Sequence, residues 1–148
     1  MILAKALKVK NRLVKKINSL QQDITGENSI RVDNERKIVV TELMETLHKT
    51  IEELIRLKIA IFAASTPMRE NILRLGELKS RIVFLQGIDT AEGKMAEKDT
   101  YHRTSSEVEY AVEFDKLYIK EEVGQCEEKI DELQEELDQF NHKTDVEI

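Results

Sequence analysis

The chain has 148 residues, of which 41% are hydrophobic and 35% charged, with one Pro, five Gly and 5% aromatic residues. A charged share above the usual ~25%, with so little Pro and Gly, is typical of long helices and excludes collagen-like and low-complexity chains. The single cysteine cannot form an internal disulfide and suits a reducing compartment. No apolar run reaches the roughly 18 residues that a membrane span needs.

The charge is unevenly distributed around the net value of −6. Residues 1–22 carry six basic side chains and no acidic one, whereas residues 121–139 carry nine acids and one lysine. Lysines interrupt every apolar run near the N-terminus, so we expect no secretory signal and a cytoplasmic protein. A basic start also occurs in mitochondrial transit peptides, but here it continues into a longer helical pattern. The two charged segments can attract each other, within one protomer or between two.

Three stretches before residue 87 repeat apolar residues at steps of three and four, which predicts helices over about 2–25, 41–64 and 67–86. Gly26 is expected to end the first helix, because Gly tolerates the left-handed conformation. Thr66-Pro67 is typical of a helix start and predicts a break between the second and third helices. A joint this short favours an antiparallel pair of those two helices.

Between the third and last helices, residues 87–106 form a long polar connection. Residues 108–114 then alternate apolar and polar side chains, which predicts a half-buried strand. A lone strand is not stable, so it needs a partner. The candidates are 30–32, 37–40, or the same segment of another protomer.

The last helix is expected to open at Asp115. Its apolar residues follow strict heptad steps of three and four, the strongest pattern in the chain. We expect this seam both to fill the protomer's own core and to mediate self-association. Its residues are Ile119, Val123, Cys126, Ile130, Leu133, Leu137 and Phe140.

The two halves of the chain resemble each other. Residues 13–21 match 78–86 at an offset of 65, and 51–54 match 130–133 at an offset of 79. One interpretation is a pair of helix–loop–helix units that hide their apolar stripes against each other. The other is coincidence between similar amphipathic helices.

These patterns predict a mainly α fold. We expect long antiparallel helices in a four-helix bundle or coiled-coil-like arrangement, with a small β element. The chain is expected to form a single helical domain over residues 1–148, made of two pseudo-repeated hairpins at about 1–65 and 66–148.

Motifs for catalysis or metal binding are weak. Glu45-x-x-His48 matches half of a di-iron bundle pattern, but no second copy exists and His48 lies beside the apolar stripe. Cys126 occupies a core position of the seam, where cysteines are usually inert. The chain has no Gly-rich phosphate loop, nucleophile elbow or CxxC pair. We therefore expect no catalytic residues, no metal and no cofactor, and keep a metal-dependent enzyme around Glu45 and His48 as the weakest hypothesis.

A basic stripe follows the first helix at Lys5, Lys8, Arg12 and Lys15. Such a stripe can bind nucleic acid or an anionic membrane surface. No aromatic residues interleave with it and the whole chain is acidic. A solvated face, or a partner for the acidic last helix, is the stronger interpretation.

Several short motifs carry a resemblance to a known family. They are Met1-x-Leu3-Ala4-x-Ala6-Leu7, Tyr101-x-Arg103, Ser106-Glu107-Val108 with Tyr110, and Asn141-x-x-Thr144. Together they resemble a family of small uncharacterised bacterial proteins, some of which carry the name septicolysin. This chain differs by extra residues between Arg103 and Glu107, and its first loop lacks an acidic, Pro-containing stretch.

The resemblance implies a mainly helical bundle with a small β element and supplies no established activity. It directs attention to Tyr101, Arg103 and Glu107 as a possible contact for a ligand or another subunit. The alternative is that Arg103 and Glu107 merely pair and order the loop.

The hypothesis favoured by the sequence is a non-enzymatic structural or interaction protein, a homo-oligomer with itself as partner. The alternative is a nucleic-acid or anionic-surface binding module that uses the basic first helix.

Overall fold

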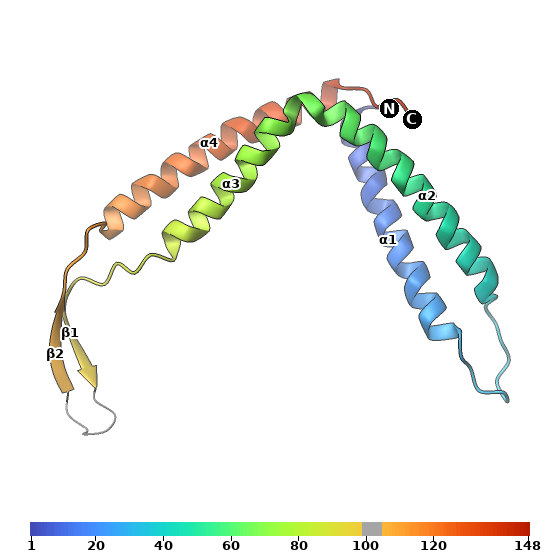
Figure 1. The fold of residues 1–148 in the computed structure, drawn as a ribbon, viewed down its shortest axis with the longest axis horizontal. Coiled ribbons are helices and arrows are strands. Elements are labelled where there is room, and N and C mark those ends of the chain that lie inside the picture. Colours follow the sequence, from blue (N-terminus) through green and yellow to red (C-terminus); the bar gives the residue numbers. More distant parts are fainter. Residues whose placement is uncertain (99–104) are drawn as a thin grey trace. The chain divides into compact units, whose positions relative to one another are not determined.

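The computed structural model describes residues 1–98 and 105–148, and it is mainly helical with one small sheet (Figure 1). The elements in chain order are α1 (Leu3–Glu27), α2 (Val40–Ser65), a 3-10 turn η1 (Thr66–Met68), α3 (Arg69–Gln86), β1 (Gly93–Lys98), β2 (Ser105–Tyr110) and α4 (Lys116–Lys143). This confirms the predicted fold class, a mainly α protein with a small β element.

The chain divides into two compact units. The first unit comprises residues 1–69 and 137–148, and the second comprises residues 70–136. Helix α4 contributes most of its length to the second unit and its last turns to the first. The first unit therefore combines both ends of the described chain.

The core of the first unit lies between α1 and α2, which run antiparallel side by side (Figure 1). The apolar positions of both helices recur with the helical period, so that each helix turns one stripe toward the other. The buried residues of this core are Leu3, Ala6, Leu13, Ile17, Leu20, Leu47, Leu54, Leu57 and Val146. Each buried leucine contributes about 1.5–3 kcal/mol relative to its exposed state.

A tail following α4 closes this unit. The Val146 N–H donates to the Met1 carbonyl oxygen at 2.7 Å, and the Leu3 N–H donates to the Thr144 carbonyl oxygen at 2.7 Å. The first N–H groups of a helix have no acceptor within the helix, so the tail satisfies one of them on α1. Val146 itself is only 3% exposed. The tail is thus part of the core and also a cap.

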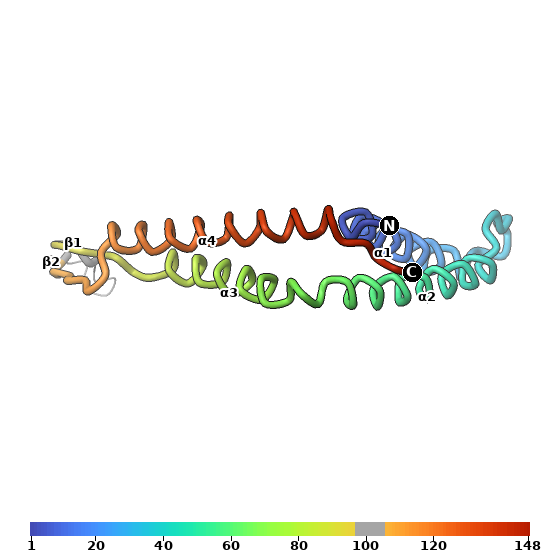
Figure 2. The backbone as a smooth tube through the Cα atoms, turned by 90° about the horizontal axis from the view of Figure 1, so that it is seen from above, coloured from blue at the N-terminus to red at the C-terminus, as the bar shows by residue number. Residues whose placement is uncertain are grey.

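The second unit holds α3 against α4, and the two helices lie side by side in both views (Figures 1 and 2). Asn71 Nδ2 donates to Glu136 Oε2 at 2.8 Å, and Arg81 Nη2 donates to Glu122 Oε2 at 3.0 Å. As the numbers rise on α3 and fall on α4, the helices are antiparallel. Their buried side chains are Leu75 and Leu85 on α3 and Cys126 and Leu133 on α4.

The predicted end of the first helix is wrong, whereas the predicted break between the second and third helices is present, with a different conformation at Thr66. Helix α1 continues through Gly26 to Glu27, and Asn28 remains right-handed at φ −64°, ψ −39°, with its N–H donating to the Ile24 carbonyl. At the second boundary, Thr66 is helical rather than extended, at φ −50°, ψ −43°. The Thr66 N–H donates to the Ala63 carbonyl oxygen. In a continuous α-helix residue 67 would donate to this oxygen, but Pro67 has no N–H. The Pro therefore produces a tight 3-10 turn, and α2 packs against α1.

The strand predicted at 108–114 is present but begins and ends earlier, as β2 (Ser105–Tyr110), and its partner strand is not one of the two segments named from the sequence. Strand β2 pairs antiparallel with β1, with Met95 opposite Val108. The partner comes from the polar connection, whereas neither residues 30–32 nor residues 37–40 form a strand. Beyond the strand, Phe114 stacks on Tyr118 with ring centroids 4.6 Å apart. The apolar residues at 112–114 therefore belong to the connection between β2 and α4 rather than to the strand.

Candidate functional site

The heptad seam of α4 faces inward. Cys126 and Leu133 are buried at 5% exposure, and the other five seam residues are half-buried. Residues 119–133 of the seam lie in the second unit, whereas Leu137 and Phe140 lie in the first, where Phe140 packs against the core. The seam therefore has a use within the protomer, and self-association through it stays a prediction.

The basic stripe on α1 is open to solvent. Lys5, Lys8, Arg12 and Lys15 are all exposed. Within the described ranges, no acidic side chain forms an ion pair with any of these four cations. The stripe is available to an external anion.

Of the three residues that the family resemblance indicated as a contact, only Glu107 lies in the described part of the chain. Tyr101 and Arg103 lie outside the described residues. Glu107 lies on β2, exposed, with Ala96 as its partner on β1. Whether these three residues form a contact stays a prediction.

The candidate metal motif lies on the surface of α2, where both Glu45 and His48 are exposed. Over residues 1–98 and 105–148, no three His, Cys, Asp or Glu side chains gather in a metal-binding group. Cys126, the only cysteine, is buried in the seam.

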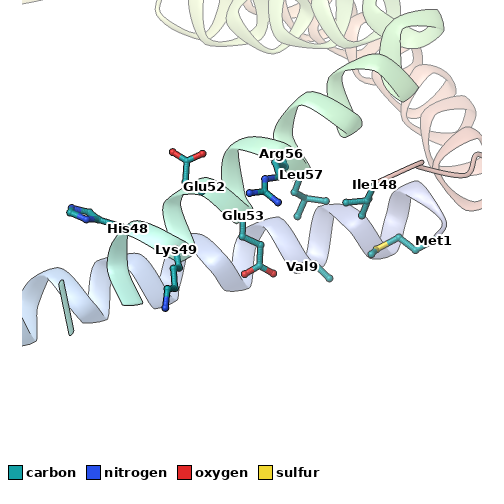
Figure 3. Close-up of a pocket in the computed structure, with 9 residues that line it drawn as sticks. All are labelled: Met1, Val9, His48, Lys49, Glu52, Glu53, Arg56, Leu57 and Ile148. Carbon is teal, nitrogen blue, oxygen red and sulfur yellow. The ribbon is translucent and has the colours of Figure 1, made fainter. Parts of the chain in front are cut away.

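A groove on the first unit was not foreseen from the sequence (Figure 3). Its volume is about 720 Å³, and its apolar wall consists of Met1, Val9, Leu57 and Ile148. Met1, Leu57 and Ile148 gather at one end, and His48 lies at the other (Figure 3). Met1, Leu57 and Ile148 are far apart in the sequence, so no local sequence pattern predicts that they form one wall.

Charged side chains of both signs border the groove. Lys49 and Arg56 flank Glu52 and Glu53 along α2. Because the four charges cancel, the border selects neither an anionic nor a cationic ligand. A ligand of this groove would therefore be recognised by its shape and its apolar surface rather than by its charge.

Two helices carry a second apolar face that the fold leaves exposed. On α2, Ile55, Ile59 and Phe62 are 44%, 65% and 62% exposed. The Arg69 guanidinium lies 4.2 Å from the centroid of the Phe62 ring and covers it in part. Side chains four and three residues apart share one side of a helix, so these three form a continuous stripe.

The corresponding face of α3 is more exposed still. Leu73, Val83 and Phe84 are 64%, 71% and 67% exposed, and Ile72 is 45% exposed. The sequence contained most of the signal for both faces, because all of these apolar residues except Ile72 fall off the main stripe of their helices. Ile72 was assigned to the main stripe of its helix, and the structure leaves it 45% exposed. The others were missed because only one stripe per helix was expected.

Comparison with known proteins adds no identification, since no family model, no curated protein and no solved structure matches this chain. Among the helices of the described residues, none is both long and apolar enough to span a bilayer.

Proposed function

We propose that the protein is a non-enzymatic interaction protein that self-associates through helical faces. One observation carries this proposal: α2 and α3 each bury one apolar stripe and expose a second. Contiguous exposed apolar side chains mark interaction sites more often than scattered ones do. Covering them removes apolar surface from water at about 25 cal/mol per Å².

The residues singled out in the sequence suit this role. The α4 seam and Cys126 are packing positions, whereas Glu45, His48 and the basic stripe are open helix positions. The proposal requires no cofactor. It places the protein in the cytoplasm, because a lone cysteine such as Cys126 suits a reducing compartment. Membership of the bacterial family that includes septicolysin-named proteins is part of the proposal and rests on the short motifs alone.

Native mass spectrometry and sedimentation of the untagged chain test the proposal. We expect a closed oligomer whose mass is a whole multiple of the chain mass and which dissociates on dilution. A protein that remains monomeric at about 100 μM would contradict self-association, because that concentration corresponds to only about −5.5 kcal/mol of binding free energy.

The exposed basic stripe supports a second candidate function, binding to nucleic acid or to an anionic surface. Replacing Lys5, Lys8, Arg12 and Lys15 with Gln should abolish salt-dependent binding to duplex DNA or anionic vesicles. For duplex DNA, four lost phosphate contacts should reduce the slope of log K against log salt by about 3–4.

A matched control removes the same charge elsewhere. Lys37, Lys49, Lys58 and Lys143 are also exposed, and their replacement with Gln should leave binding largely intact. Equal loss in both variants would mean that net charge rather than the stripe attracts the ligand, which contradicts this second function.

A further inference from the structure

The outward face of α3 has a regular arrangement. Ile72 and Val83 are eleven residues apart, as are Leu73 and Phe84, and eleven residues make close to three helical turns. Each pair therefore lies on one side of the helix, away from Leu75 and Leu85, which are buried. Two large side chains occupy each end of the face.

Two small, uncharged residues lie at the centre of the same face, and Glu77 lies at its border. Gly76 and Ser80 lie between the two apolar ends. A Cβ atom added at Gly76 would meet no other atom within 4 Å, so the space above it is open. The face thus has a shallow centre between two apolar ends, and another helix can approach its backbone closely.

The arrangement is complementary to itself. Ile72 and Phe84 are equally distant from Leu78, as are Leu73 and Val83, and Gly76 and Ser80. When two α3 helices lie antiparallel with their centres at residue 78, each large side chain meets a large one and each small residue meets a small one. A two-fold symmetric dimer requires a patch of this kind.

We propose that a second copy of this chain docks on this face, with the two α3 helices antiparallel about a two-fold axis that crosses the face at the level of residue 78. This inference rests on the proposed self-association and names its surface. The four large side chains expose on the order of 500 Å² per copy, so two copies reach the roughly 1,000 Å² that a specific interface needs. An interface at this lower limit fits a dimer that dissociates readily.

The net negative charge of the second unit predicts how the dimer responds to salt. Residues 70–136 carry nine basic and eighteen acidic side chains, so two copies of the second unit repel each other. The two-fold arrangement also brings Glu77 near the same residue of the other copy. Because salt screens this repulsion, the dimer should tighten as salt is raised. Assembly by attraction between the basic α1 and the acidic α4 would weaken instead.

The first test is sedimentation of Phe84→Glu against Ile59→Glu. Both positions are exposed apolar sites, on α3 and α2 respectively, so neither change should disturb the fold, which circular dichroism checks. We expect Phe84→Glu to weaken the dimer at least about 30-fold, as for a large aromatic side chain that is buried in an interface, and Ile59→Glu to leave it unchanged.

The second test fixes the register by disulfide formation in a Cys126→Ala background. A mixture of Gly76→Cys and Ser80→Cys chains should form mixed disulfides, because these positions lie opposite each other. Either variant alone should form far fewer, since its own two cysteines are offset by about 6 Å along the helix axis.

The outcomes separate this inference from the proposed function. An oligomer that survives Phe84→Glu but is lost in Ile59→Glu would overturn the α3 interface and leave self-association standing. A wild-type chain that is monomeric at about 100 μM would overturn both. An oligomer that loosens as salt is raised, or equal cross-linking in all cysteine samples, would also overturn the α3 dimer.

Discussion

The two helical pairs of this protein are held together by different means. The α1–α2 pair buries a continuous set of apolar side chains and adds a tail that covers one end. The α3–α4 pair buries Leu75, Leu85, Cys126 and Leu133 and adds polar links between exposed positions. Pairs of helices with the same apolar period therefore differ in how strongly they are joined.

The comparison shows where stability should be concentrated. Apolar burial contributes more per residue than surface ion pairs do, which have a median contribution of about 0–1 kcal/mol. We therefore expect the first unit to resist unfolding more than the second, and this difference can be tested residue by residue.

The largest effect should come from the core of the first unit. Leu57 is 3% exposed, and Leu57→Ala should lower the free energy of unfolding by about 2–5 kcal/mol, through lost burial and the cavity left behind. Urea denaturation followed by circular dichroism measures this. Leu117→Ala is the matched control, because Leu117 is a leucine of the second unit that is 63% exposed and lies outside the α3 face. Equal losses at both positions would contradict the assigned core.

A smaller effect is expected from the tail. Val146→Ala removes two buried methyl groups and should lower the free energy of unfolding by about 1.5–2.5 kcal/mol. Ile148, two residues further on, is 72% exposed, so Ile148→Ala should change stability little. If Val146→Ala is as mild as Ile148→Ala, the tail does not belong to the core.

The polar links of the second unit should matter less. Arg81→Ala breaks the ion pair with Glu122, whose two side chains are 56% and 21% exposed. We expect a loss of about 0.2–1 kcal/mol in the free energy of unfolding, and less at high salt. A double-mutant cycle with Glu122→Gln isolates the pair. A coupling above about 2 kcal/mol would mean that polar links rather than apolar burial hold this unit.

The smallest effect is expected at the basic stripe. The variant with Gln at Lys5, Lys8, Arg12 and Lys15 should keep its free energy of unfolding within about 0.5 kcal/mol, since these exposed cations have no acidic partner among the described residues. Thermal unfolding measures it. A large loss of stability would show that the stripe is structural and would remove the reason to assign it to an external anion.

The helices were readable from the sequence because each one repeats apolar residues with the helical period, and the α4 seam is the clearest case. Strand β1 was not, because Gly93, Lys94 and Ala96 show no alternation of their own. Its place is fixed by pairing with β2, a non-local contact that composition does not encode.

The candidate surfaces also differ in how far the sequence predicted them. The basic stripe was predictable, since helical spacing alone places its four cations on one side. The second apolar faces of α2 and α3 were in the sequence but were not distinguished from core positions. The groove and the tail contact join residues near 1, 57 and 146–148, and only the folded chain reveals that these segments meet.

The position of Val146 in the core of α1 and α2 also sets an order of events during synthesis. The second unit is a continuous segment, so it can form as soon as residue 136 has left the ribosome. The first unit begins with residues that are translated before the second unit, yet its core lacks Val146 and its tail contacts until residues 144–146 emerge. Helices α1 and α2 therefore remain incompletely covered while residues 70–146 are translated at roughly 5–20 residues per second. A nascent-chain proteolysis experiment would see this unit become protected last, although it begins first.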